Sequence, residues 1–492
     1  MTSKIIRLKD IHEKIPASLP PTRKLRILLL KPFQKITAPL QAPPLGLLYI
    51  TSSIREKLGS NVDIKIIDMK LQRMIPEKIT SVLKEYTPDV VGFSALNYEA
   101  HAGHCIAKRI KQYNPSIITV FGGPYALKNA KTILDDKNID WVFEGAADRS
   151  FPEALLRLAQ NQEPDESILG MSFRRLDGSI HFSTREDQIN DLDSLPPPAW
   201  DMVNLDTYAA EPNMAANLKG KRYAMLFTSR GCPYLCNYCH DIFSKKFVYH
   251  SVDYVIAEIE RLYEQYGVDE FQIVDDIFNL HKPRLKAIML EVQRRWPNKL
   301  KFTFPNGVRA DILDEDVINA MCDSGTYAVS IAIETVTPRL QALVEKHLNI
   351  EKTKHAIALL GKRNIQVTGF FMLGFPTETP EEIKATIDFA IESDLTLAFF
   401  FSVVPQFGTP LYELALKENP DVTTRLNQVD SGAYRNSQSW YQQAYNYPLA
   451  HTARIANIRF YFSPHRVIKI LRHWNIKALI RSLKVFLRIL VT

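Results

Sequence analysis

Short apolar runs alternate with helix-like segments along most of this chain. Between residues 24 and 160, five runs have the length and composition of buried strands: LRILLL, VDIKIID, DVVGFSAL, SIITVFGG and WVFEG. Continuous apolar strands separated by helices are typical of a parallel sheet covered on both faces. We therefore predict an α/β fold in which residues 24–160 form a doubly wound, Rossmann-like domain. Ligands of such sheets bind at the carboxyl ends of the strands.

A second series of the same kind occupies residues 211–416. Its strand candidates are AMLFTS, FQIVDD, KFTF, AVSIAIE, QVTGFFML and LAFFFSVV. Six β/α units are fewer than the eight of a complete TIM barrel, so they predict a (β/α)6 partial barrel. Residues 1–23 are predicted as a polar arm, and residues 161–210 as a connector with a hairpin at Asp177-Gly178. Residues 417–492 are predicted as a helical C-terminal extension.

Positive charge is concentrated at the C-terminal end. The formal net charge is +7, and eight Lys and Arg residues with no acidic residue lie between Arg459 and Arg488. The rest of the chain is nearly neutral, which argues against a nucleic-acid partner. Lys477, Arg481, Lys484 and Arg488 share one face of a predicted amphipathic helix. This helix either contacts an anionic membrane surface or packs on the barrel.

The cysteine content indicates the compartment. The chain has five Cys, an odd number, and three of them lie within eight residues. This pattern favours a reducing compartment and a metal or redox role over a disulfide framework. The sequence shows no apolar signal segment and no run of roughly 18 apolar residues that could span a membrane. We expect a cytoplasmic protein, with membrane association through the C-terminal helix as an alternative.

Cys232, Cys236 and Cys239 directly follow the first strand candidate of the barrel. Loops at that end of a barrel carry the chemistry, and thiolates are suited to Fe–S clusters and zinc. Three closely spaced thiolates can hold three irons of a [4Fe-4S] cluster and leave the fourth iron open. The alternative is a structural zinc site with His240 as fourth ligand. Cys105 and Cys322 lie in apolar helical segments and are expected to be buried.

The Cys-x3-Cys-x-aromatic-Cys run resembles the radical S-adenosylmethionine (SAM) superfamily, and the resemblance covers residues 220–415. In that family the open iron binds SAM, and reductive cleavage gives a 5′-deoxyadenosyl radical that abstracts hydrogen. An electron donor such as flavodoxin or ferredoxin is implied. The motifs VDDIF, AIETVTP and GFPTET also match, with departures at Thr335 and Thr377. The resemblance implies SAM contacts at four residues: Tyr238, Asp276, Glu334 and Gly374.

The first domain resembles the cobalamin-binding domain that precedes many such barrels. The matching pieces are PPLGL from Pro43, VGFS and GGPYAL, and they imply cobalamin contacts at Ser94, Gly122 and Gly123. The chain lacks the Asp-x-His-x-x-Gly segment, so no His ligand to cobalt is expected. The usual GEGE stretch appears as GAAD, ending at Asp148. The alternative is a scaffold domain without cobalamin. His101 and His104 are expected to be surface or capping residues.

The two domains together resemble the class that includes cobalamin-dependent C-methyltransferases and the anaerobic magnesium-protoporphyrin cyclases. This resemblance implies an enzyme that methylates an unactivated carbon of a small-molecule or lipid substrate. A radical cyclase or rearrangement enzyme without methyl transfer is one alternative, and a zinc-binding regulatory module is another. Methylthiolation of tRNA is disfavoured, because there is neither a second Cys triad upstream nor a basic RNA-binding extension.

Overall fold

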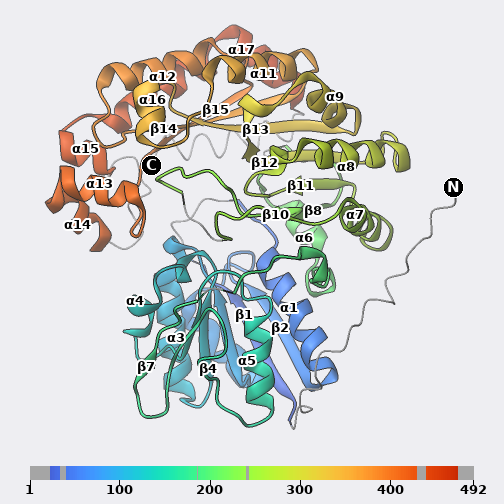
Figure 1. Cartoon of the computed structure of the whole chain (residues 1–492), viewed down its shortest axis with the longest axis vertical. Coiled ribbons are helices and arrows are strands. Elements are labelled where there is room, and N and C mark those ends of the chain that lie inside the picture. Colours follow the sequence, from blue (N-terminus) through green and yellow to red (C-terminus); the bar gives the residue numbers. More distant parts are fainter. Residues whose placement is uncertain are drawn as a thin grey trace.

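The computed structural model describes residues 23–33, 40–185, 187–215, 217–239, 243–428 and 439–474. Two sheets, each with its own helices, lie one above the other, with an irregular segment of the chain between them (Figure 1). The first sheet belongs to the N-terminal part of the chain and the second to the part after residue 220.

The first sheet has seven strands in the order β2-β1-β3-β4-β5-β6-β7, and its first five strands are parallel. The strands are β1 (Leu25–Lys31), β2 (Val62–Asp68), β3 (Val90–Ser94), β4 (Ile118–Gly122), β5 (Trp141–Phe143), β6 (Met171–Arg174) and β7 (Ile180–His181). The helices are α1 (Leu45–Leu58), α2 (Ile79–Tyr86), α3 (Ala100–Tyr113), α4 (Ala130–Leu134) and α5 (Ser150–Ala159).

Alternate residues of these strands supply two separate cores. Leu28 and Leu30 of β1 pack with apolar residues of α2, α3 and α4, whereas Ile27 and Leu29 pack with those of α1 and α5. Because successive side chains of a strand point to opposite faces, both faces of the sheet are covered. This arrangement confirms the predicted doubly wound domain. The antiparallel strands β6 and β7 extend the same sheet into the predicted connector.

The second sheet is parallel throughout, with the order β15-β14-β13-β12-β11-β8. Its six strands confirm the predicted partial barrel: β8 (Tyr223–Leu226), β11 (Glu270–Ile273), β12 (Lys301–Val308), β13 (Thr326–Glu334), β14 (Gln366–Leu373) and β15 (Leu397–Ser402). Its helices are α6 (Leu205–Ala210), α7 (Val252–Tyr266), α8 (Lys282–Arg295), α9 (Glu315–Asp323), α10 (Pro338–Leu343), α11 (Ile350–Lys362) and α12 (Pro380–Glu392).

After the barrel, the described residues form the helices α13 (Pro410–Glu418), α14 (Pro420–Gln428), α15 (Trp440–Tyr445), α16 (Leu449–Tyr461) and α17 (Pro464–His473). The hydroxyl of Tyr461 accepts a hydrogen bond from the N–H of Ala398 (3.2 Å) and donates to its carbonyl (2.7 Å). The edge strand β15 is therefore partly covered. The predicted basic helix around Lys477 and Arg488 lies outside the described residues. None of the described helices is long and apolar enough to cross a membrane.

The C-terminal extension also covers the loop after β14. A Cβ on Gly374, whose φ is +88°, would lie 2.7 Å from atoms of both Leu449 and Tyr441. The Glu378 carboxylate accepts hydrogen bonds from the backbone N–H groups of Gly374 (2.5 Å) and Phe375 (2.9 Å). Burial raises the pKa of Glu378 from its usual 4.5 to about 8.

This raised pKa predicts a pH-dependent stability. Between pH 4.5 and about 8 the unfolded chain loses the proton of Glu378 while the folded chain keeps it, so stability falls as the pH rises through this window. Glu378→Gln lacks this loss. We expect its stability relative to the wild type to grow by up to about 5 kcal/mol from pH 4.5 to 8. Urea unfolding of the chain at several pH values measures this difference.

The exposed Glu381, in the first turn of α12 and three residues after Glu378, provides the control, since Glu381→Gln should follow the wild-type curve at every pH. Parallel stability curves for Glu378→Gln and the wild type would contradict the prediction.

Candidate active site

The cysteine loop starts from the short hairpin of β9 (Ser229–Arg230) and β10 (Val248–Tyr249). Cys232 and Cys236 are partly buried, Cys239 is exposed, and all three are free thiols. Gly231 has φ of +82°, and a Cβ there would lie 2.2 Å from the carbonyl oxygen of Lys246. A larger residue is therefore excluded at this position, and the path of the chain into Cys232 is tightly fixed.

Two acidic residues after β11 hold the start of this loop. Asp275 accepts hydrogen bonds from the N–H (2.6 Å) and hydroxyl (2.6 Å) of Thr228 and from the hydroxyl of Ser229 (2.5 Å). Burial raises the pKa of Asp275 to about 6. Asp276 is exposed and accepts from the N–H of Gly231 at 2.8 Å. In this structure Asp276 thus orients the cysteine loop, and the predicted contact with SAM stays a prediction.

A buried ion pair links the cysteine loop to the end of β13. Lys346 Nζ lies 3.2 Å from Glu334 Oε1 and donates to the Tyr238 hydroxyl at 3.1 Å. Glu334 adopts φ of +67°, a strained conformation for a residue with a side chain. The structure therefore brings two of the predicted SAM residues together. Lys346 was missed by the sequence interpretation, since it belongs to none of the recognised motifs.

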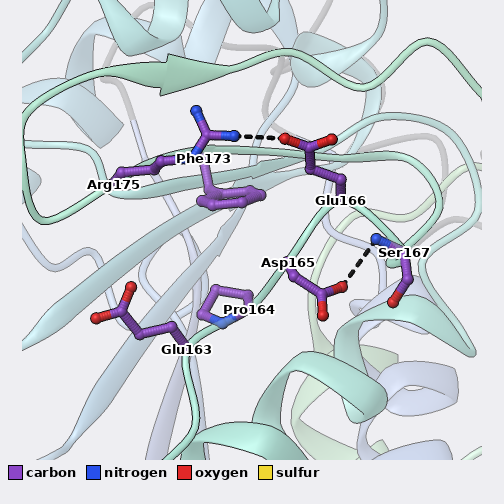
Figure 2. Close-up of a pocket in the computed structure, with 7 residues that line it drawn as sticks. All are labelled: Glu163, Pro164, Asp165, Glu166, Ser167, Phe173 and Arg175. Atoms are coloured by element: carbon purple, nitrogen blue, oxygen red, sulfur yellow. Dashed lines mark hydrogen bonds and ion pairs between the residues drawn. The ribbon is translucent and has the colours of Figure 1, made fainter.

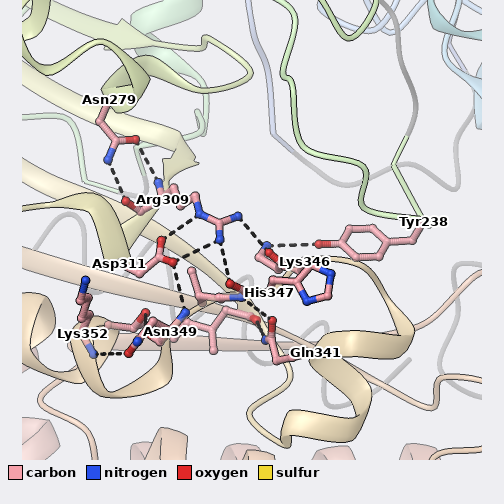
Figure 3. Close-up of polar contacts among 12 residues, drawn as sticks. Tyr238, Asn279, Arg309, Asp311, Gln341, Lys346, His347, Asn349 and Lys352 are labelled. Atoms are coloured by element: carbon pink, nitrogen blue, oxygen red, sulfur yellow. Dashed lines mark hydrogen bonds and ion pairs between the residues drawn. The ribbon is translucent and has the colours of Figure 1, made fainter.

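Arg309 after β12 is the centre of the contacts shown in Figure 3. Its guanidinium pairs with Asp311 (2.8 and 3.1 Å) and donates to the carbonyls of Lys346 (3.0 Å) and His347 (3.1 Å). It also lies over the ring of Tyr234 in the cysteine loop, 3.9 Å from the ring centre. One cation thus fixes the segment that carries Lys346 and supports the cysteine loop.

The departures noted in the sequence have visible consequences. Thr377 has φ of +67°, the region that favours glycine, which gives a physical reason for Gly at this place in the motif. Arg339 donates to the hydroxyl (3.2 Å) and carbonyl (2.8 Å) of Thr377 and so supports the turn. Thr335 is fully buried with its hydroxyl 3.3 Å from that of Thr386.

The first domain brings its predicted cofactor residues together at the carboxyl ends of β3 and β4. Gly123 has φ of +81°, and a Cβ there would lie 3.0 Å from Ser94 Oγ. Ser94, Gly122 and Gly123 are each half-buried. Asn97, just beyond Ser94, donates to Gln406 of the barrel at 2.7 Å. The loops after both sheets therefore face each other, and a group bound at Ser94 would lie on the barrel side.

The remaining His and Cys candidates lie outside this arrangement. His104 contacts Asp136 (2.7 Å) and the hydroxyl of Tyr125 (3.2 Å), so its ring nitrogens are satisfied locally, and His101 is exposed. Cys105 and Cys322 are half-buried instead of buried, because each lies near the edge of the apolar face of its helix.

The donor set can be tested against the two metals considered. Within the described ranges, no three His, Cys, Asp or Glu side chains lie close enough together to hold a metal ion, and His240 lies outside those ranges. The candidate donors in the described part are three thiols of one loop, which suit a cluster with one open iron better than a four-ligand zinc site. In this structure the three thiols are therefore not gathered around one point, although their number and donor type match the ligands of a [4Fe-4S] cluster. Their role as its ligands stays a prediction.

The hollow in Figure 2 lies elsewhere. It is lined by residues 163–167, Phe173 and Arg175, and Arg175 forms an exposed ion pair with Glu166 at 2.6 Å. Since β6 runs antiparallel to β5, Arg175 follows the end of β6 at the amino edge of the first sheet. This edge is opposite to the one that carries Ser94 and Gly122, so the hollow is not part of the candidate site.

Sequence comparisons match a different family to each of the two parts of the chain that contain a sheet. Residues 226–390 match the radical SAM superfamily, and residues 35–155 match the B12 binding domain. An uncharacterized methyltransferase, PH0819 of Pyrococcus horikoshii, is 30% identical over 453 residues, which cover 90% of this chain and 93% of that protein. The cytidylyl-2-hydroxyethylphosphonate methyltransferase of Streptomyces wedmorensis is 30% identical over 468 residues, covering 84% and 85%.

Among solved structures, the radical SAM methyltransferase TsrM of Kitasatospora setae, with cobalamin and a [4Fe-4S] cluster bound, superposes with a TM-score of 0.63. The match has 19% sequence identity and covers 80% of this chain and 75% of TsrM, so it supports the fold. The cofactors expected from the sequence, a [4Fe-4S] cluster, SAM and cobalamin, are confirmed by the two matched domains. The chain belongs to the radical SAM superfamily, among the members that carry an N-terminal B12 binding domain.

Proposed function

We propose that this enzyme methylates a carbon atom of a small molecule with an apolar part, using cobalamin and radical SAM chemistry. The observation that carries the proposal is the position of the cysteine loop. It is bound on one side by Asp275 and Asp276 of the barrel, and on the other by Asp148 of the B12 binding domain through Arg230. A loop held by both domains suits a reaction that uses the cofactors of both.

Each group has its own residues in this proposal. The cluster is held by Cys232, Cys236 and Cys239, SAM by Tyr238, Asp276, Glu334 and Gly374, and cobalamin by Ser94, Gly122 and Gly123. When bound, the cluster and SAM supply hydrogen-abstracting radical chemistry, and cobalamin supplies a methyl group. An external electron donor of the flavodoxin or ferredoxin type is part of the proposal.

In this proposal, the protein side chains orient the bound groups and exclude water from them. The Lys346 ammonium neutralises Glu334 in a buried setting, so this carboxylate stays available as an acceptor for hydroxyl or ammonium groups. Gly374 allows the loop after β14 to pack directly under the C-terminal extension. These contacts keep water away from the loop end.

The aromatic side chains on the interior face of β14 and β15 support the proposal that the substrate has an apolar part. Phe371 and Phe400 face the outer helices, since Phe371 contacts Phe389 of α12 and both are buried. Phe399 and Phe401 alternate with Phe400 and therefore point to the opposite, inner face. They are 38% and 51% exposed, and each ring centre lies about 6 Å from that of Phe370. Exposed aromatic groups of this kind typically mark binding surfaces.

Two other possibilities are separated by experiment. A reaction without methyl transfer would leave the product without the added carbon. Lipid substrates and membrane contact through the basic C-terminal helix depend on residues outside the described ranges and stay predictions.

The cofactor assignment is tested by anaerobic reconstitution with iron, sulfide and hydroxocobalamin. We expect about four iron and four sulfide per chain, together with a cob(II)alamin signal in electron paramagnetic resonance. Alanine at Cys232, Cys236 or Cys239 should remove the cluster, whereas Cys322→Ala should retain it. Zinc in place of iron would contradict the radical assignment, and loss of cobalamin on gel filtration would contradict its role. With methyl-deuterated SAM, product that lacks the labelled methyl would exclude methylation.

The aromatic surface gives a second prediction. Phe399→Ala with Phe401→Ala removes two ring faces, so the affinity for an apolar dye such as bis-ANS should fall by about ten-fold. Leu290→Ala provides the control, because Leu290 is also an exposed apolar side chain (53%) but lies on the outer helix α8. Fluorescence titration measures the affinities. Equal dye binding by the double variant and the control would remove the support for an apolar substrate.

A further inference from the structure

Arg230 joins the two domains immediately before the cysteine loop. Its guanidinium donates to both carboxylate oxygens of Asp148, with distances of 2.8 and 3.1 Å. Arg230 is 4% exposed and Asp148 is 6% exposed. Asp148 lies within the B12 binding domain and Arg230 within the radical SAM part, so this buried pair crosses the boundary between the two cofactor domains.

Aromatic rings from both sides enclose the same guanidinium. Its central carbon lies 5.1 Å from the ring centre of Tyr49 on α1 and 4.9 Å from that of Phe243 in the cysteine loop. A planar guanidinium can pair with a carboxylate through two nitrogens and stack on rings at the same time, which an ammonium cannot do. The site is therefore specific for Arg in its geometry as well as its charge.

The segments around this pair connect Asp148 to the first cysteine. A cavity at the junction is lined by the turn before Asp148, the connector and the loop that returns from the cysteines, including Gly145, Asn190 and Lys246. Two residues after Arg230 comes Cys232, and Gly231 between them is held by Asp276 and by the close approach of Lys246. A displacement of Asp148 would thus reach the first cysteine within two residues.

We propose that Arg230 and Asp148 are a positioning pair, which fixes the cysteine loop relative to the B12 binding domain and so sets the separation between the cluster and cobalamin. This inference rests on the proposed function for its consequence, but the pair itself is a property of the chain. It also gives the GAAD stretch a role, because the acidic residue that ends this stretch is the partner of Arg230.

The test uses two variants. Asp148→Asn keeps the shape of the side chain and removes its charge, whereas Arg230→Lys keeps the positive charge and loses the paired nitrogen donors of the guanidinium. Arg261→Lys is the matched control, because Arg261 also pairs with both oxygens of a carboxylate, that of Glu258, but within the single helix α7. The first readout is the relaxation of the cob(II)alamin signal with the cluster oxidised and reduced in the reconstituted full-length protein. Reduction should enhance relaxation in the wild type and the control. The enhancement should be strongly reduced in Asp148→Asn and intermediate in Arg230→Lys, at unchanged iron and cobalamin content.

The second readout does not depend on the cofactors. Hydrogen exchange of backbone amides in residues 231–239, measured before and after reconstitution, should become about ten-fold faster in Asp148→Asn and stay unchanged in Arg261→Lys. Wild-type relaxation and exchange in both test variants would overturn the inference. If the wild type retains no cobalamin, the proposed function fails, and the exchange rates alone decide whether the pair positions the loop. If Asp148→Asn does not fold, Arg230→Lys decides on the same readouts.

Discussion

The hydrogen bonds that Asp275 accepts from Thr228 and Ser229 determine where the cysteine loop begins. They follow from strand register, because Leu226 at the end of β8 pairs with Ile273 at the end of β11. Two residues beyond each strand end, Thr228 meets Asp275. The carboxylate is fully enclosed, and each unmatched donor there would cost about 1–3 kcal/mol. The first barrel loop therefore has one favourable starting geometry, and this geometry determines where the chain enters the cysteine segment.

From this start, three cations position the loop from different directions. Arg309 lies over Tyr234 and Lys346 reaches Tyr238, both from the barrel, while Arg230 reaches the first domain. Arg is used where a planar group must pair and stack together, and Lys where a single point charge suffices.

The sequence alone predicted the two sheets, because strand periodicity is local, and it predicted the cysteine loop, because the three residues are adjacent in the chain. The partners that hold the loop could not be predicted in the same way. Arg230 and Asp148 are 82 positions apart, and Tyr238 and Lys346 are 108 apart. Such pairs depend on strand order and domain packing, which local patterns do not contain. The SAM and cobalamin contacts of individual residues stay predictions for the same reason.

Two strained backbone positions near these loops are stabilised by residues that are distant in the sequence. Glu334 and Thr377 both have positive φ, at a cost of about 1–3 kcal/mol each. Lys346 stabilises the first through its ion pair, and the hydroxyl of Tyr445 on α15 accepts from the N–H of Thr377 at 3.0 Å. The C-terminal extension had no role in the sequence interpretation beyond a basic tail. Because α15 supports Thr377 and also packs against Gly374, the extension helps to shape the loop after β14. Substitutions in the helices of the extension should therefore act first on the conformation of that loop.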